Sequence, residues 1–416
     1  MNWIEDLPSQ IQQAVQEVDQ QIQPQITKIN QQIDNNQAKV LQAFTHQQMA
    51  ESHLSGSTGY GNYDEGRETL DQVYAEVFHT QAALVRPQFV SGTHTIAVGL
   101  FGCLQPGQKL LYLTGKPYDT LQEVIGMNKR QAGTLKEYGI EFKYQPLTTD
   151  GMVDYSHLAQ TLADFQPNVV AIQRSRGYEV RPSYTVAQIA EMIAFVKERL
   201  PEVIVFVDNC YGEFSEEQEP TEFGADLMAG SLYKNAGAGL ATTGGYLVGR
   251  KDLIEKSAIR LTAPGIGSHE GATGPYLRGM IEGFFLAPQV TGSAIKGAIF
   301  AAALLEKLGF VVTPKWDEPR TDLIQTIILG SADKMVQFAR AIQKYSPIDS
   351  FVQPEASPME GYEDQIVMAA GTFVEGSTIE LSADGPIRPP YAIYLQGGLT
   401  YSHVRIAVAH ACADIL

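Results

Sequence analysis

The sequence predicts an α/β fold built around a mostly parallel sheet. Short apolar runs alternate with helical stretches from about residue 67 onward, as in chains that wrap helices around a sheet. These runs are almost continuously apolar, which is typical of strands buried on both faces. Polar residues suited to chemistry follow four of the runs, at the edge where open parallel sheets bind their ligands.

The expected elements can be placed along the chain in order. Strands are predicted at Gln88–Val90, Lys109–Leu113, Val169–Gln173, Val203–Val207, Leu227–Ala229 and Gly245–Val248. Helices are predicted at Arg67–Phe78, Val186–Arg199 and Gly292–Leu308. Further strands are predicted at Gln365–Ala369 and Val404–Val408. The Gly- and Pro-rich residues 251–288 are expected to form a connection or to border the site.

Residues 1–50 carry a narrow apolar stripe at helical spacing. Its members recur at steps of three and four residues: Ile11, Val15, Val18, Ile22, Ile26, Ile29 and Ile33. Pro24 interrupts the stripe, so we expect two helical segments or one kinked helix. The stripe indicates either an arm that docks on a neighbouring subunit, which we expect first, or a helix packed on its own domain.

The size and charge of the chain limit what it can be. At 416 residues it exceeds the usual size of one hydrophobic core, so two domains are expected. We divide it into a helical arm at 1–50, a large α/β domain at 51–290 and a smaller α+β domain at 291–416. The net charge of −17 argues against nucleic acid or an anionic membrane as a partner, because both reward positive charge.

The sequence shows no sign of export or membrane insertion. The N-terminus is acidic, and no apolar run approaches the roughly 20 residues that cross a bilayer. The three cysteines, Cys103, Cys210 and Cys412, lie far apart and lack metal-ligand spacing, so no metal site is expected from them. A cytoplasmic protein with reduced thiols is expected.

Two residues carry the chemical prediction. Lys234 lies in Gly230-Ser-Leu-Tyr-Lys-Asn, and Asp208 ends the apolar run VIVFVD. A lysine amine can bind the aldehyde of pyridoxal 5'-phosphate (PLP), and a carboxylate can keep the pyridine nitrogen protonated so that the ring accepts electrons. A buried carboxylate needs a cationic partner, which a pyridinium N–H or a neighbouring arginine would supply.

Further residues fit the remaining parts of such a cofactor. Ser91-Gly92-Thr93 precede an apolar helical run, where free N–H groups can hold a phosphate, although a simple N-cap is the everyday explanation. Ser231 is well placed to donate to a phosphate oxygen. His94 is expected either near the ring or in a structural role. Tyr118 could stack on a flat cofactor or belong to the core.

The order of these motifs resembles a known group of enzymes. Ser91-Gly92-Thr93, Tyr118-Asp-Thr, Asp208-Asn209 and Ser231-x-x-Lys234 are similar to the Cys/Met-metabolism group of fold-type I PLP-dependent enzymes. The segments IQRSRGY, VDNCYGEF and RPPYAIYLQGGLTY resemble most closely its aluminium-resistance or methionine γ-lyase-like branch. The resemblance implies a PLP-dependent transferase-like fold, with a mostly parallel seven-stranded sheet in the large domain and a smaller α+β C-terminal domain.

The resemblance also implies roles for individual residues. Lys234 would bind PLP covalently and move the Cα proton, Asp208 would contact the pyridine nitrogen, and Tyr118 would stack on the ring. Phosphate binding would fall to Ser91, Gly92, Thr93 and Ser231, with His94 nearby. Arg388, rather than Arg405, would take the substrate α-carboxylate, because Arg388 lies in a Pro-rich loop.

Other implied roles depend on a second subunit. Tyr60 or Tyr63 and Arg67 would be contributed to the cofactor site of the neighbouring subunit. Lys234 or a tyrosine, either Tyr60 or Tyr118, would serve as a proton donor to the leaving sulfur. A homo-oligomer, either a dimer or a dimer of dimers with shared active sites, is therefore expected.

The sequence thus predicts a PLP-dependent carbon–sulfur lyase that acts on a small sulfur-containing amino acid by β- or γ-elimination. An aminotransferase or a γ-replacement enzyme on the same scaffold is the alternative within this class. A different alternative is a non-catalytic protein that holds a hard cation such as aluminium on a carboxylate cluster, which is more simply a solvated loop. The cluster consists of Glu213, Glu216, Glu217, Glu219 and Glu222.

Overall fold

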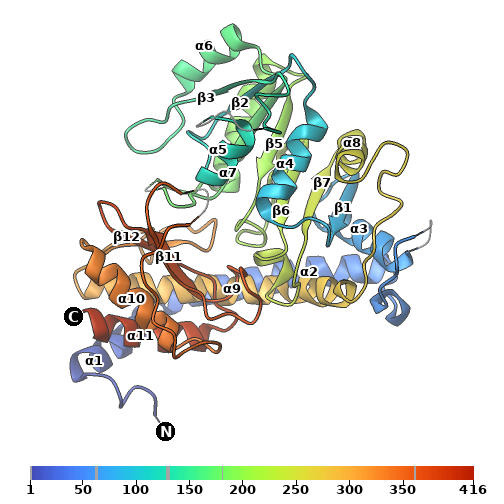
Figure 1. Cartoon of the computed structure of the whole chain (residues 1–416). Helices are drawn as coiled ribbons and strands as arrows, with labels where there is room; N and C mark the ends of the chain where they lie inside the picture. The colour runs from blue at the N-terminus through green and yellow to red at the C-terminus, as the bar shows by residue number, and fades with distance from the viewer. Residues whose placement is uncertain (1, 61–63, 128–131, 180, 360–361) are drawn as a thin grey trace.

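The computed structural model describes residues 2–60, 64–127, 132–179, 181–359 and 362–416. Figure 1 shows an α/β unit, a C-terminal unit built on a second sheet, and long helices that run beneath both. The first unit contains a seven-stranded sheet in the order β1-β7-β6-β5-β4-β2-β3, in which only β7 runs antiparallel to its neighbours. Its strands are β1 (Ala82–Arg86), β2 (Lys109–Tyr112), β3 (Glu141–Tyr144), β4 (Val169–Gln173), β5 (Ile204–Asp208), β6 (Leu227–Ser231) and β7 (Gly245–Gly249).

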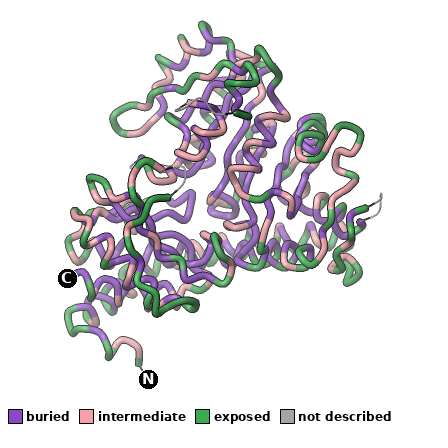
Figure 2. Tube along the Cα trace, viewed as in Figure 1, coloured by how far each residue is buried: buried purple, intermediate pink, exposed green. Residues whose placement is uncertain are grey.

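Helices cover both faces of this sheet, which explains why its strands are apolar throughout. The helices of this unit are α3 (Glu65–Val77), α4 (Gly92–Cys103), α5 (Asp119–Ile125), α6 (Tyr155–Phe165), α7 (Val186–Arg199) and α8 (Lys251–Leu261). Along β4, Val170 and Ile172 join one apolar cluster, whereas Val169 and Ala171 join the other. Buried residues accordingly concentrate in the strands (Figure 2).

Most predicted strands are confirmed, but the first is wrong. β2, β4, β5, β6 and β7 match the predicted runs to within two residues at either end. The predicted strand Gln88–Val90 lies in the turn and loop that connect β1 to α4, and the strand itself is Ala82–Arg86. Pro87 follows directly after β1 and has no N–H to donate, so pairing with β7 stops at Arg86.

The C-terminal unit contains a five-stranded antiparallel sheet in the order β10-β11-β12-β9-β8. Its strands are β8 (Val311–Thr313), β9 (Gln325–Ile328), β10 (Ile366–Ala369), β11 (Ser382–Pro386) and β12 (Ala392–Gln396). Its helices are α9 (Tyr276–Lys307), α10 (Ala332–Lys344) and α11 (Tyr401–Ile415).

The strand predicted at Val404–Val408 is wrong, because these residues lie inside helix α11. Thr400 caps this helix by accepting a hydrogen bond from the backbone N–H of His403 at 3.3 Å. The helix packs against both α9 and α10, so consecutive residues are buried on more than one side. That burial produces the continuous apolar run that mimics a strand.

The N-terminal stripe forms two helices, α1 (Ser9–Gln21) and α2 (Gln23–His46), with Pro24 in the first turn of the second. They pack on their own chain rather than extending as a free arm: α2 lies beside α9 (Figure 1). Gly292 of α9 approaches Ile33 so closely that a Cβ there would meet its side chain at 2.3 Å. Helix α9 also runs unbroken through residue 290, and the division into domains remains a prediction.

Within the described ranges, no helix combines the length and the apolar character needed to cross a bilayer. The cysteines Cys103, Cys210 and Cys412 are all buried and free.

Candidate active site

A cavity of about 590 Å³ lies where the C-terminal ends of β4, β5 and β6 face the second sheet. Gln173, Asp208 and Ser231 are the last residues of these three strands, and all three line it. Parallel pairing of the strands brings their ends to one edge of the sheet. A larger hollow of about 730 Å³ beside β3 contains none of the predicted site residues. We therefore locate the candidate site in the first cavity.

Asp208 is held at the end of β5, only 4% exposed. Its carboxylate accepts a hydrogen bond from the backbone N–H of Cys210 at 3.1 Å. Burial raises the pKa of Asp208 above its ordinary value, and the charges of Lys234 and Arg181 act in the opposite direction. A buried carboxylate that lacks a close ion pair is suited to a cationic N–H of a bound group.

Lys234 lies three residues beyond β6 and faces the same cavity. Its Nζ lies 4.0 Å from the centroid of the Tyr211 ring. Burial lowers the pKa of Lys234, but Tyr211, Cys210 and Asp208 outweigh this effect, so the net shift is upward. Burial raises the pKa of both Tyr211 and Cys210 as well. The free lysine is therefore an ammonium near neutral pH.

The N-terminus of α4 forms a small polar cup against the end of β6. A Cβ on Gly92 would lie 3.3 Å from the Cβ of Ser231 and 3.4 Å from the Sγ of Cys210, so the absence of a side chain keeps the cup open. Ser91 caps the helix by accepting a hydrogen bond from the backbone N–H of His94 at 3.1 Å. Thr93 and Ser231 present hydroxyls to the cavity. A helix N-terminus with such hydroxyls is suited to a phosphate group.

Tyr118 borders this cup and His94 does not. The hydroxyl of Tyr118 lies 3.1 Å from Thr93 Oγ1, which also lies 3.1 Å from Thr120 Oγ1. Burial holds the pKa of Tyr118 well above its usual range, so the phenol is neutral. The Nδ1 of His94 accepts a hydrogen bond from the backbone N–H of Val90 at 3.2 Å, and the residue is not part of the cavity lining. This geometry fits the structural role that was expected as an alternative.

The two arginines considered for the substrate carboxylate lie in different places. Arg388 lines the cavity, and its side chain is 45% exposed and donates to Asp364 at 3.0 Å. Arg405 lies in α11 and pairs with Asp19 of α1, away from the cavity. The geometry is thus compatible with Arg388 and not with Arg405.

Of the residues expected to serve a neighbouring subunit, Tyr60 and Arg67 are absent from the cavity lining of their own chain. Tyr60 is 91% exposed. Arg67 is 1% exposed and donates to the carbonyls of Gly271 and His269 at 3.2 and 3.0 Å. Tyr63 lies outside the described residues. Their roles remain predictions.

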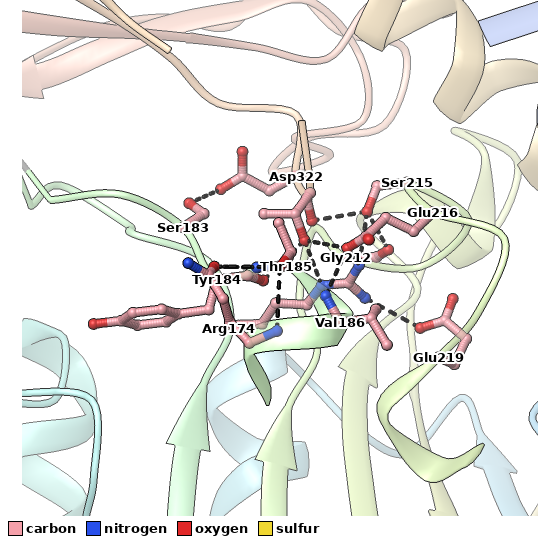
Figure 3. A network of polar contacts seen from close by, with 12 residues as sticks. Arg174, Ser183, Tyr184, Thr185, Val186, Gly212, Ser215, Glu216, Glu219 and Asp322 are labelled. Carbon is pink, nitrogen blue, oxygen red and sulfur yellow. Dashed lines mark hydrogen bonds and ion pairs between the residues drawn. The ribbon is translucent and has the colours of Figure 1, made fainter. Parts of the chain in front are cut away.

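A buried arginine joins the loop after β5 to the C-terminal unit (Figure 3). Arg174, which follows β4 and is 0% exposed, uses all five of its N–H donors. Its acceptors are Asn209 (2.8 Å), Glu219 (3.2 Å), Ser215 (3.2 Å), Glu216 (2.9 Å) and, across the cavity wall, Thr321 (3.0 Å). The network fixes the loop that carries Cys210 and Tyr211 and positions it relative to the second sheet.

The glutamates of the predicted carboxylate cluster have partners within the fold. Glu216 and Glu219 are turned toward Arg174, whereas Glu213 accepts a hydrogen bond from the Tyr246 hydroxyl at 2.7 Å. Glu217 accepts from Asn35 at 2.8 Å. Within the described residues, no group of three or more His, Cys, Asp or Glu is arranged to hold a metal ion.

Several residues of the cavity were not anticipated from the sequence. They are Thr120, Tyr178, Tyr211, Tyr362, Ser382, Asp384 and Gln396. Tyr211 has a positive φ of 71°, which is uncommon for an aromatic residue and is often found at functional sites. The signal that could have indicated it is its place in VDNCYGEF, three residues after Asp208.

Comparison with known proteins identifies the family. The methionine γ-lyase family profile matches residues 11–416. This chain belongs to the methionine γ-lyase family. The Bacillus subtilis protein YnbB is 54% identical over 378 residues, which cover 91% of this chain and 90% of YnbB.

Solved structures agree closely with the fold. A Listeria monocytogenes protein described as involved in aluminium resistance is 52% identical, with a TM-score of 0.95 over 97% of this chain and all of that one. A Clostridium novyi protein described as a carbon–sulfur lyase involved in aluminium resistance is 46% identical, with a TM-score of 0.94 over 99% of this chain and 97% of that one.

More distant structures share the architecture. The PLP-dependent protein YhfS of Escherichia coli is 18% identical, with a TM-score of 0.62 over 93% of this chain and 97% of that one. Cystathionine γ-synthase of Xanthomonas oryzae is 17% identical, with a TM-score of 0.56 over 84% of this chain and 86% of that one. These likenesses confirm the fold of PLP-dependent enzymes for this chain.

Proposed function

We propose that this chain is a PLP-dependent carbon–sulfur lyase that acts on a sulfur-containing amino acid by β- or γ-elimination. The observation that carries the proposal is the placement of Lys234 and Asp208 after adjacent strands β6 and β5, facing one cavity beside the cup at the start of α4. The description of the Clostridium novyi relative as a carbon–sulfur lyase supports the same reaction class.

The described residues fit the three functional groups of PLP. The cup formed by Ser91, Gly92, Thr93 and Ser231 suits the phosphate, because helix N–H groups and hydroxyls converge where Gly92 leaves room. Lys234 presents an amine for the aldehyde. When bound, PLP supplies an electron-withdrawing ring that stabilises negative charge at Cα of an amino acid.

Each residue of the site then has a defined task. Asp208 holds a proton on the ring nitrogen, which its buried position favours because the carboxylate gains a cationic partner. The Lys234 amine, which lines the cavity, would take the proton from Cα of a substrate bound there. Tyr118, which is neutral and hydrogen-bonded to Thr93, would stack on the ring and could donate a proton to the leaving sulfur.

Binding of the substrate uses the mouth of the cavity. Arg388 is placed there to pair with the α-carboxylate, and its partner Asp364 would be displaced or shared. Tyr233 lies beside Lys234 in the lining, and its backbone carbonyl accepts hydrogen bonds from Ser377 and Thr378 of the second unit. These hydrogen bonds fix the segment that carries Lys234 relative to the second unit, which also contains Arg388.

We further propose that the enzyme is a homo-oligomer with shared sites. Arg67 and Tyr60 lie outside the cavity of their own chain, which is consistent with service to a neighbour. The hydrogen bonds to the carbonyls of Gly271 and His269 already hold the guanidinium of Arg67 in one position.

The test is product analysis with protein loaded with PLP. Cysteine-, cystathionine- and methionine-type substrates are incubated with wild type and with Lys234→Ala, and ammonia, thiol and keto acid are measured. We expect equal amounts of ammonia and keto acid from wild type and none from the variant. Product that forms only when a keto-acid acceptor is added would instead indicate an aminotransferase. Full activity of the variant, or no product from any substrate, would overturn the proposal.

A further inference from the structure

The wall of the cavity opposite Lys234 contains a carboxylate that the proposed reaction does not use. Asp384 lies in β11 opposite Tyr394 of the paired strand β12, and Gln396 of that strand lies opposite Ser382. Asp384 is 2% exposed, Ser382 is 2% exposed and Gln396 is 4% exposed, yet all three line the cavity. These residues belong to the second sheet, whereas the cup at the start of α4 belongs to the first unit.

Polar atoms of this wall lack partners. One oxygen of Asp384 accepts a hydrogen bond from Gln396 Nε2 at 3.0 Å. The other oxygen has no hydrogen-bond partner in the described part of the chain, and neither has the hydroxyl of Ser382 or of Thr378. Buried polar atoms are rarely left unpaired, so each unpaired atom here calls for a donor or acceptor from a bound molecule.

Aromatic rings surround the same carboxylate. Tyr178 packs against Tyr394 with ring centroids 5.2 Å apart and against Tyr362 at 5.7 Å. Tyr178, Tyr362 and Asp384 line the same cavity. Burial first, and then the charge of Asp384, raises the pKa of both phenols. Aromatic faces beside a carboxylate are the surroundings that proteins use to bind an ammonium group.

The charge of the lining points to the same ligand chemistry. Among the described lining residues, the only cations are Lys234 and Arg388, which are assigned to the cofactor and to the α-carboxylate. The carboxylates are more numerous: Asp119, Glu179, Asp208, Glu375 and Asp384. A substrate side chain that ends in a cation is therefore favoured over one that ends in an anion or a methyl group.

We propose that Asp384, with Ser382, Gln396 and the surrounding tyrosines, forms a subsite that binds a terminal ammonium on the side chain of the amino-acid substrate. The inference rests on the proposed function, because it takes the α-amino end of the substrate to be held at the cofactor. It assigns to the enzyme a substrate class: sulfur amino acids whose leaving thiol carries a positively charged amine.

The test compares ligands that differ only in the terminal group. L-Ornithine and L-norleucine are isosteres that end in ammonium and methyl, as are L-lysine and L-2-aminoheptanoate. None has a leaving group at the β- or γ-carbon, so equilibrium affinity for the PLP-loaded protein can be measured by calorimetry without turnover. Of L-ornithine and L-lysine, we expect the one that binds more tightly to exceed the affinity of its methyl-ended isostere at least about tenfold. This difference corresponds to about 1.4 kcal/mol.

Asp384→Asn keeps the shape of the side chain and removes the charge. In this variant we expect the preference for the ammonium ligands to disappear, whereas L-norleucine and L-2-aminoheptanoate should bind as they do to wild type. Glu375→Gln is the matched control, because Glu375 lines the same cavity but is exposed, and the preference is expected to persist. A preference that is absent in wild type, or unchanged in Asp384→Asn, would overturn the proposal.

The pH dependence of the wild type provides a test that needs no variant. Burial raises the pKa of Asp384 to about 7, while the nearby Tyr178 phenol, the hydrogen bond from Gln396 and the charge of Lys234 lower it. The ammonium preference should therefore increase between pH 6 and pH 8, as the carboxylate ionises. Other titratable groups that face Asp384 have a raised pKa and keep their charge in this window: Tyr178, Tyr211, Tyr362, Tyr394 and Lys234. A preference that stays constant or falls would contradict the proposal.

A measurement of PLP uptake distinguishes failure of the proposed function from failure of the subsite alone. Protein that takes up no PLP refutes the proposed function, whatever the ligands do. Protein that takes up PLP and binds both members of each pair equally refutes the subsite alone. As a check by turnover, S-(2-aminoethyl)-L-cysteine should exceed S-propyl-L-cysteine in kcat/KM, and Asp384→Asn should remove that difference.

Discussion

Replacement of Asp384 by Asn should change how the stability of the protein depends on pH. Burial raises the pKa of Asp384 from its ordinary value of 3.8 to about 7 in the folded chain, with the residue 2% exposed. A raised carboxyl pKa means that the folded state keeps its proton after the unfolded chain has lost it. The free energy of unfolding therefore falls as pH rises from about 4 to about 7.

The size of this effect follows from the shift. At roughly 1.36 kcal/mol per pKa unit, raising the pKa from 3.8 to about 7 corresponds to about 4 kcal/mol of lost stability at pH 8. At pH 4 the loss is below about 1 kcal/mol. Asn cannot ionise, so Asp384→Asn should gain about 2–4 kcal/mol over wild type between pH 4 and pH 8, after allowance for its altered hydrogen bond with Gln396.

The assay is urea unfolding of both proteins at several pH values, without added ligand. Other groups titrate in this range, but they are common to both proteins, so the difference between them isolates residue 384. A difference that does not change from pH 4 to pH 8 would refute the reasoning, because it would mean that Asp384 has an ordinary pKa and that water reaches the wall of the cavity.

Other perturbations have equally definite outcomes. Arg174→Leu leaves the buried Glu219 and the partly buried Glu216 without their cation and should cost about 3–5 kcal/mol in urea unfolding, whereas Arg278→Leu on the exposed face of α9 should cost less than about 1 kcal/mol; equal costs would refute the network. Covalent capture of PLP should speed up with pH, by up to about tenfold per pH unit below the raised pKa of Lys234, because only the neutral amine reacts; a rate independent of pH would contradict that shift. Mixing inactive Arg67→Ala and Lys234→Ala proteins should restore part of the activity if sites are shared, and no recovery under conditions shown to exchange subunits would count against sharing.

Local pattern was sufficient for the parts of the fold that bury both faces or follow a regular period. Strand β4 and helix α7 have the predicted bounds, because one is a continuous apolar run and the other has a capping box at Thr185. The strand prediction is wrong in helix α11 and correct in β4 for the same reason, because both segments are nearly continuous apolar runs. Burial on several sides gives a continuous apolar run in either conformation, and only the packing against α9 and α10 distinguishes them.

The cofactor side of the site could be predicted and the substrate side could not. Lys234, Asp208 and Ser91-Gly92-Thr93 follow strands of one sheet, so their convergence follows from the parallel topology. Asp384 and Lys234 line one cavity only because the second sheet packs beside the first, and the two residues are 150 positions apart in the sequence. No local signal marks it: a single Asp in a strand of small residues does not differ from a solvated one until the wall around it is known.

The central claim, that Lys234 holds PLP in this cavity, is tested most directly by a visible absorption spectrum of the protein incubated with PLP. The spectrum is repeated after borohydride reduction, and the reduced protein is digested and mapped. The account predicts a yellow chromophore that borohydride removes, with the pyridoxyl label on Lys234. A protein that stays colourless, or a label that falls on another lysine, would contradict the account.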